Sequence, residues 1–243
     1  MVKEKIQTAI RLVFPARCIS CGDLVESDFG LCGPCWRDTP MIGGLVCDSC
    51  GVPLPGPYDG QAVECDDCMQ TPRPWGQGRA ALIYKDNARR LVLGLKHGDR
   101  QDLVSPAAKW LALAAKPLLR PNMIVAPIPL HRLRLLRRRY NQAALLAQAL
   151  ARHLNLDFCP DLLVRPHQRG SMDGLTQEER FEKMENAIRP HTSRMHKMAA
   201  RPVLLVDDVM TSGATFAAAT EACFKARARE VNVLALARVA KDA

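Results

Sequence analysis

Apolar residues between positions 79 and 239 form two kinds of pattern. Short, nearly continuous apolar runs of strand length occur at 79–86, 123–129, 161–165, 202–208 and 231–239. Longer segments with apolar residues at helical spacing separate these runs, at 87–97, 105–121, 141–154 and 214–228. Strands that alternate with helices predict an α/β fold with a doubly wound, mainly parallel sheet.

Residues 15–78 differ from this part, because they are rich in Cys, Gly and Pro and carry little periodic apolar pattern. Segments such as GVPLPGPYDG are typical of loops. A unit this small needs metal or disulfide cross-links to be stable. In front of it, apolar residues at helical spacing up to Phe14 predict a short helix that ends before Pro15. We therefore expect an N-terminal unit at 1–78, made of this helix and a small cysteine-rich module, and an α/β domain at 79–243.

Eight cysteines form four C-x2-C pairs in the N-terminal unit. They divide into two sets of four, Cys18, Cys21, Cys32 and Cys35, then Cys47, Cys50, Cys65 and Cys68. Two cysteines at this spacing can direct both sulfurs into one tetrahedral site if the chain turns sharply after them, and Gly22 and Gly51 suit such a turn. Four thiolates around one ion leave no open position. The pattern therefore indicates structural zinc, one or two Zn²⁺ ions, rather than a catalytic metal.

Other interpretations of the cysteines stay open at this point. An iron–sulfur centre, a redox dithiol set or a single occupied site would fit the same spacing, and pairing between the two sets is a further alternative. We favour two zinc ribbons, each formed within one set. Cys159 and Cys223 have no such partners, and we expect them to be buried as small apolar residues.

The charge of the chain bears on its partners and its compartment. A formal net charge of +9 favours anionic partners such as phosphate, nucleotides or nucleic acid. No uncharged apolar stretch reaches the ~18 residues that a membrane-spanning helix needs. The first residues lack the long apolar region and the cleavage site of a signal peptide. We therefore expect a cytoplasmic protein without a membrane span, a compartment where paired cysteines bind metal more often than they form disulfides.

The segment VLLVDDVMTSGAT, residues 203–215, joins a predicted strand to a predicted helix. Ligands of open parallel sheets bind at the carboxyl ends of the strands, where Asp207 and Asp208 are placed. Adjacent carboxylates can accept hydrogen bonds from the two hydroxyls of a ribose or help to hold Mg²⁺. The loop that follows offers hydroxyls and free N–H groups at a helix N-terminus, which favour a phosphate. Its residues are Thr211, Ser212, Gly213, Ala214 and Thr215. The segment therefore fits a ribose 5-phosphate.

This segment resembles the fingerprint of type I phosphoribosyltransferases, which bind phosphoribosyl pyrophosphate (PRPP). Together with the cysteine module, LGLKHGD at 93–99 and VAPIPLHRLRLLRRRYNQ at 125–142 resemble the ComF family over almost the whole chain. The resemblance implies a type I phosphoribosyltransferase fold after a double zinc ribbon, PRPP with Mg²⁺ as ligand, and a role in natural competence, the uptake of DNA for transformation. One departure is Arg139, which stands where the family run Arg-Gly-aromatic-Asn-Gln has glycine.

Four basic residues are candidate PRPP contacts beside the phosphate loop. Lys96 stands at a helix end that precedes the core sheet. Arg132 and Arg138 belong to the basic segment after the strand 123–129, which by resemblance ends in the pyrophosphate loop. Guanidinium groups pair well with pyrophosphate oxygens, whereas other arginines of this segment would face solvent or a nucleic-acid backbone. Arg165 opens the polar segment 165–175, which we interpret as a lid or as a connecting loop.

Three functions are compatible with these features. The first is a ComF-type protein that binds PRPP and assists DNA uptake, with single-stranded DNA or a DNA-uptake helicase as candidate partner. The second is a phosphoribosyltransferase that transfers ribose 5-phosphate from PRPP to an unidentified acceptor, with Asp207 and Asp208 as the candidate catalytic residues. The third is a PRPP sensor without catalysis. The sequence shows no dedicated general base, so it leaves open whether the protein is an enzyme.

Overall fold

The computed structural model describes residues 14–97, 99–131, 133, 135–136, 139–166 and 174–240. The helix expected in front of Pro15 falls outside these residues except for Phe14. Within the described ranges, no helix combines the length and the apolar character that crossing a membrane requires.

A five-stranded sheet forms the centre of the α/β domain, and every strand pair in it is parallel. Its order is β1-β7-β6-β2-β3. The strands are β1 (Gly78–Ile83), β2 (Ile124–Pro127), β3 (Asp157–Phe158), β6 (Pro202–Met210) and β7 (Glu230–Arg238). This architecture confirms the mainly parallel α/β fold that the apolar pattern predicts.

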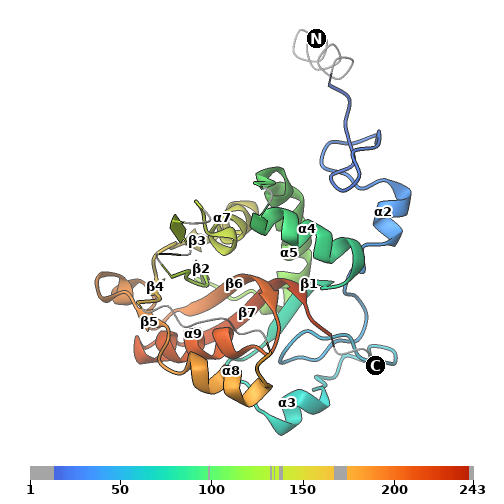
Figure 1. The fold of residues 1–243 in the computed structure, drawn as a ribbon. Coiled ribbons are helices and arrows are strands. Elements are labelled where there is room, and N and C mark those ends of the chain that lie inside the picture. The colour runs from blue at the N-terminus through green and yellow to red at the C-terminus, as the bar shows by residue number, and fades with distance from the viewer. Residues whose placement is uncertain are drawn as a thin grey trace.

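Helices cover both faces of the sheet, because successive strand residues point to opposite sides. In β6, Val203 and Leu205 join one core cluster with Phe216 of α9 (Ala214–Lys225). Leu204 and Val206 join a second cluster with Leu146 of α7 (Gln142–Leu154). Figure 1 shows α8 and α9 on one side of the sheet and α4, α5 and α7 on the other. The longer helices are α4 (Asp86–His97), α5 (Val104–Ala115), α7 (Gln142–Leu154), α8 (Gln177–Met184) and α9 (Ala214–Lys225). The described part of the domain also contains three short 3-10 helices, η1 (Gln101–Leu103), η2 (Lys116–Leu118) and η3 (Thr192–Lys197).

The strand expected at 161–165 does not join the main sheet. Instead β4 (Leu163–Val164) pairs antiparallel with β5 (Arg189–Pro190) in a separate two-stranded sheet. The fifth strand of the main sheet is β3, which is only two residues long. Pro160 follows it closely and cannot donate a ladder hydrogen bond, so the strand pairing ends there and the chain turns away.

The first cysteine set lies next to α4. Ser20 Oγ donates to Asn87 Oδ1 at 2.5 Å, and Asn87 Nδ2 donates to the carbonyl oxygen of Cys35 at 3.2 Å. From the other side, Arg100 Nη2 donates to the carbonyl oxygen of Ile19 at 2.9 Å. The short helix α2 (Gly33–Arg37) belongs to this set. The first ribbon is therefore attached to the domain at α4 and at the loop that follows it (Figure 1).

The second cysteine set packs directly on the sheet. Asp48 Oδ1 lies 2.5 Å from Arg79 Nη2 of β1. A Cβ atom at Gly51 would lie 2.8 Å from the Cα atom of Arg79, so only glycine allows this close approach. Cys47 and Cys68 belong to the same core cluster as the buried side chains of α9 and β6, and α3 (Asp66–Gln70) closes this ribbon. The second ribbon is thus part of the hydrophobic core, although its sequence has the composition of a loop.

Candidate ligand site and metal centres

Two adjacent acids lie near the carboxyl end of the central strand β6. The sequence places them at the end of the strand, but pairing continues past them to Met210, which lies opposite Arg238 of β7. Asp208 is only 8% exposed and Asp207 is half-buried. The backbone N–H of Asp208 donates to Asp207 Oδ1 at 2.8 Å. The acids are therefore held within the ladder rather than on a free loop.

Two cations from distant segments accompany these acids. Lys96 Nζ, at the end of α4, lies 3.2 Å from Asp208 Oδ1. Burial and the neighbouring charge of Asp208 together raise the pKa of Asp207 to about 8, while Lys96 and Arg165 act in the opposite direction. The structure thus brings together three charged residues that the sequence analysis selected separately, Asp207, Asp208 and Lys96.

Because its pKa is raised, we expect Asp207 to lower the free energy of unfolding by an amount that depends on pH. A carboxyl that is held neutral in the fold but ionises freely in the unfolded chain destabilises the protein increasingly as pH rises from about 4 to about 8. Asp207→Asn should therefore gain about 4 kcal/mol of stability relative to the wild type between pH 5 and pH 9, measured by urea unfolding.

The matched control for that experiment is Asp102→Asn. The hydrogen bond from Arg100 lowers the pKa of Asp102, so its stabilisation is already complete at pH 5. The difference between this variant and the wild type should stay constant from pH 5 to pH 9. An Asp207→Asn curve parallel to the wild-type curve would contradict the raised pKa.

The loop after β6 combines a left-handed glycine with the start of a helix, an arrangement that can accept an anion. Gly213 has φ +86°, a left-handed conformation, and α9 starts directly after it at Ala214. Thr211 is exposed, Ser212 and Thr215 are half-buried, and Gly213 and Ala214 are buried. The N–H groups of the first turn of α9 are free of helical partners, and the helix dipole favours a negative charge beside them. The five loop residues selected from the sequence therefore lie together.

A cleft of about 670 Å³ opens on one side of this loop. Thr211 and Ser212 line it from the loop, and residues 52–55 of the second ribbon form an opposite wall. Three arginines also line the cleft, Arg73, Arg180 and Arg238. Each of the three has one buried side-chain nitrogen without a hydrogen-bond partner. The cleft therefore offers N–H donors beside the candidate phosphate loop.

Not every basic candidate can be placed. Arg132 and Arg138 lie outside the described residues, as do residues 167–173 of the candidate lid. Arg165 is described, and its Nη2 atom lies 3.4 Å from Met184 Sδ of α8.

The motif Tyr-Asn-Gln at 140–142 has a role that the sequence analysis missed. Tyr140 Oη donates to the carbonyl oxygen of Leu95 at 2.9 Å, and Gln142 Nε2 donates to that of Lys96 at 3.4 Å. Asn141 caps α7 and donates to the carbonyl oxygen of Ile128 at 3.0 Å. These bonds tie the end of α4 to the segment after β2, and so they position Lys96. The family motif given above singles out these residues, but it does not indicate the carbonyl groups to which they bond.

The eight cysteines of the N-terminal unit form two separate tetrads. In each tetrad the four sulfur atoms lie within 4.8 Å of one another. The tetrads join Cys18, Cys21, Cys32 and Cys35, and Cys47, Cys50, Cys65 and Cys68. This confirms pairing within each set and excludes an interleaved arrangement in this structure.

The tetrads fit zinc in detail. The Cys21 and Cys32 sulfurs are 3.6 Å apart and the Cys50 and Cys65 sulfurs are 3.7 Å apart. Zn–S bonds of about 2.3 Å in a tetrahedron require about 3.8 Å. Both expected glycine turns occur, with φ +86° at Gly22 and +71° at Gly51. The residues therefore fit structural zinc at both centres.

The other two cysteines lie apart from these tetrads. Cys159 is 1% exposed and Cys223 is 0% exposed. Burial raises the pKa of both thiols, that of Cys223 to about 12. They pack as small apolar residues, as expected.

We expect each tetrad to hold one ion independently of the other. Cys18→Ser and Cys47→Ser should each lower the bound zinc by about one ion per chain, because each removes one of four ligands from one centre. Elemental analysis of the purified variants measures this. Unchanged zinc in either variant would mean that its centre binds no zinc.

Two solved structures align with parts of the chain at low identity. Glutamine PRPP amidotransferase from Bacillus subtilis is 16% identical, and the match covers 60% of this chain and 30% of that one with a TM-score of 0.39. A hypoxanthine-guanine phosphoribosyltransferase from Bacillus anthracis is also 16% identical, over 59% of this chain and 75% of that one, with a TM-score of 0.36. The chain spans about a third of the former. The strand order and register described above establish the α/β fold of this chain.

Sequence comparisons match the cysteine module to a family and almost the whole chain to several proteins. Residues 9–69 match the Double zinc ribbon domain family. Competence protein F of Haemophilus influenzae is 29% identical over 231 residues, 93% of this chain and 98% of that protein. The DNA utilization protein YhgH of Escherichia coli is 28% identical over 93% of this chain and 99% of that protein. Competence protein ComFC of Bacillus subtilis is 24% identical over 79% and 77%. With its two cysteine tetrads and its parallel α/β domain, the chain resembles the ComF family of competence proteins over almost its whole length.

Proposed function

We propose that this protein binds PRPP with Mg²⁺ at the carboxyl edge of β6 and assists the uptake or use of DNA. The observation that carries the ligand proposal is the convergence of buried acids, a lysine and a glycine loop at one helix N-terminus. Asp207, Asp208 and Lys96 come together there, and the loop around Gly213 opens beside them. This set offers carboxylates for a ribose or Mg²⁺ and N–H groups for a 5-phosphate.

Each part of PRPP has a partner in this proposal. The 5-phosphate binds the N–H groups and hydroxyls of residues 211–215, and the ribose hydroxyls donate to Asp207 and Asp208. Mg²⁺ takes oxygen ligands from a few carboxylates and from substrate phosphates. Lys96 neutralises Asp208 until the ligand arrives and then remains near the pyrophosphate. Arg165, and by resemblance Arg132 and Arg138, add positive charge to the same ligand.

The proposed role in DNA handling has a different basis. It is supported by the relatives named as competence and DNA utilization proteins and by the net charge of +9. Single-stranded DNA or a DNA-uptake helicase is the proposed partner. Absence of nucleic-acid binding at low salt, together with normal transformation in a knockout strain, would count against this role.

A second candidate function is phosphoribosyl transfer to an acceptor. The cleft of about 670 Å³ beside Thr211 and Ser212 favours it, because an acceptor needs space next to the reacting sugar. Positive charge would develop at the anomeric carbon, and the acids would stabilise it electrostatically. A PRPP sensor without turnover would use the same site.

Calorimetric titration with PRPP and Mg²⁺, followed by a pyrophosphate-release assay on the same sample, tests these proposals. We expect saturable binding at one site per chain. Binding with turnover in the presence of an acceptor identifies a transferase, and binding without turnover for any acceptor tried favours the sensor. Absence of binding would overturn the ligand proposal.

A further inference from the structure

Trp75 connects the second metal centre to the loop that we assign to the 5-phosphate. Trp75 Nε1 donates to the carbonyl oxygen of Ser49 at 2.6 Å, and Ser49 lies between Cys47 and Cys50 in the knuckle. The Trp75 ring, which is 4% exposed, lies against Gly213. A Cβ atom at Gly213 would lie 2.9 Å from its Cη2 atom. One side chain therefore links the metal knuckle to the loop.

Two further contacts strengthen this link. Trp75 packs edge-to-face on Phe216 of α9, with ring centroids 6.2 Å apart. The Arg73 guanidinium lies 6.0 Å from the Trp75 ring centroid, and its Nε atom donates to Cys68 Sγ at 3.4 Å. The indole is thus held between Arg73, which bonds to the Cys68 thiol, and α9, whose N-terminus would bind the phosphate.

Arg238 also fixes the same loop, through hydrogen bonds to backbone carbonyl oxygens. It is 5% exposed, and its Nη1 atom donates to the carbonyl oxygens of Met210 at 3.3 Å, Val239 at 2.7 Å and Thr211. It lines the cleft whose other wall is formed by residues 52–55 of the second ribbon. The loop backbone is therefore fixed by groups that face the second metal centre.

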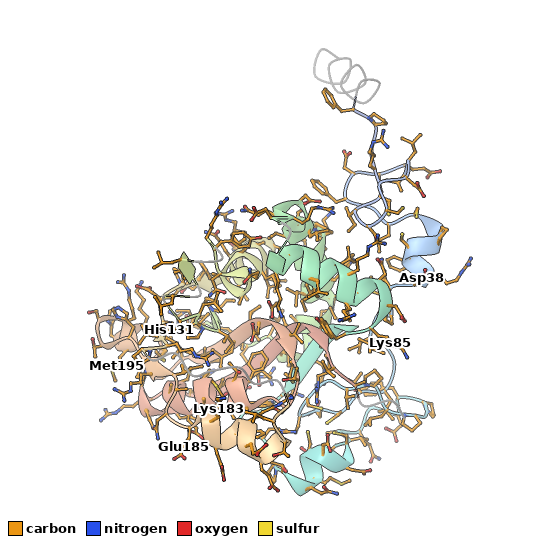
Figure 2. All side chains as sticks on the ribbon, in the orientation of Figure 1. Asp38, Lys85, His131, Lys183, Glu185 and Met195 are labelled. Atoms are coloured by element: carbon orange, nitrogen blue, oxygen red, sulfur yellow. The ribbon has the colours of Figure 1, made fainter. Side chains whose placement is uncertain are left out.

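The first ribbon has other contacts. Its described residues bond to Asn87 of α4 and to Arg100. Figure 2 places Asp38, at the end of α2 in this ribbon, on the opposite side of the domain from His131, which follows β2. The two centres have the same ligand chemistry but different neighbours, which makes the first centre a control for the second.

We propose that zinc at the second centre supports the PRPP-binding loop, so that zinc binding there and PRPP binding are positively coupled, while the first centre is uncoupled. Without the ion, the knuckle that presents the Ser49 carbonyl loses its cross-link, and Trp75 loses its anchor behind Gly213. The inference rests on the proposed function and adds a regulating metal to the same site. Coupling between two binding equilibria is reciprocal, so PRPP must also retain the zinc.

Chelator competition on the unmodified protein tests this coupling. Zinc release to a chromogenic chelator is followed with and without saturating PRPP and Mg²⁺. We expect one of the two ions to be held at least fivefold more tightly in the presence of PRPP, and the other to be unaffected. The Asp207→Asn/Asp208→Asn variant is the control for PRPP that merely binds free metal. This variant should not bind PRPP, so PRPP should not protect its zinc from the chelator.

Single-centre variants identify the protected ion. Cys18→Ser keeps only the second-centre ion, which PRPP should protect, and Cys47→Ser keeps only the first, which it should not. Trp75→Phe removes the N–H donor but retains an aromatic ring on Phe216. It should bind PRPP at least fivefold more weakly while both ions stay bound, as elemental analysis of the variant measures.

The outcomes separate this inference from the proposed function. If calorimetry shows PRPP binding but neither ion is protected, the coupling is wrong and the proposed function stands. Equal protection of both ions would also overturn it. If PRPP does not bind to the wild type, the proposed function is wrong and the coupling falls with it.

Discussion

Asp207→Asn combined with Asp208→Asn should lower PRPP affinity at least 100-fold while the protein stays folded with two zinc ions. The two amides have almost the shape of the acids but neither can balance Mg²⁺ or Lys96, whose Nζ atom lies 3.2 Å from Asp208. Loss of a charged hydrogen-bonding partner costs more than loss of a neutral one, and here two are lost. Titration calorimetry measures the affinity, and elemental analysis measures the zinc.

The control for this variant is Asp161→Asn. Asp161 forms an ion pair with Arg194 at 2.9 Å, near β4 and η3. This substitution also removes an acid from a pair, and PRPP affinity should be unchanged. Loss of zinc in the double variant would contradict the expected independence of acids and metal centres. Retained PRPP binding would show that the ligand does not use the acids.

The local features of this protein could be predicted from its sequence because each has a strong short-range pattern. The four longer strands of the sheet are apolar runs, and the tetrads follow from the C-x2-C spacing and its glycine turns. The division after residue 78 stays a prediction. The second ribbon shares a hydrophobic core with α9, which loop-like composition does not reveal.

Short elements and distant contacts could not be predicted in the same way. The two residues of β3 are too few to show a period. α8 did have a signal, the capping box of Thr176 and Glu179, which the sequence analysis did not use. The contacts of Trp75 with Gly213 and of Arg238 with Thr211 depend on the tertiary fold. They give the candidate site its support, and no local pattern indicates them.

Gly213→Val should be the most damaging single substitution in the proposed site. The residue has φ +86°, which a β-branched side chain adopts only with strain, and a Cβ atom there would lie 2.9 Å from the Trp75 ring. The ring cannot retreat easily, because it is bonded to Ser49 and packed on Phe216. We expect PRPP affinity to fall at least 100-fold and the free energy of unfolding to fall by about 2–3 kcal/mol.

Gly60→Val separates the contact from the backbone strain. Gly60 has nearly the same conformation, φ +89°, but no atom lies within 4 Å of a Cβ built there. It should therefore show only the backbone cost, about 1 kcal/mol or more, with normal PRPP affinity. Calorimetry and urea unfolding of both variants give the comparison. Suppose that both variants lost equal stability and both bound PRPP normally. The left-handed backbone alone would then explain why position 213 is glycine. Close packing of the loop on Trp75 would have no part in ligand binding.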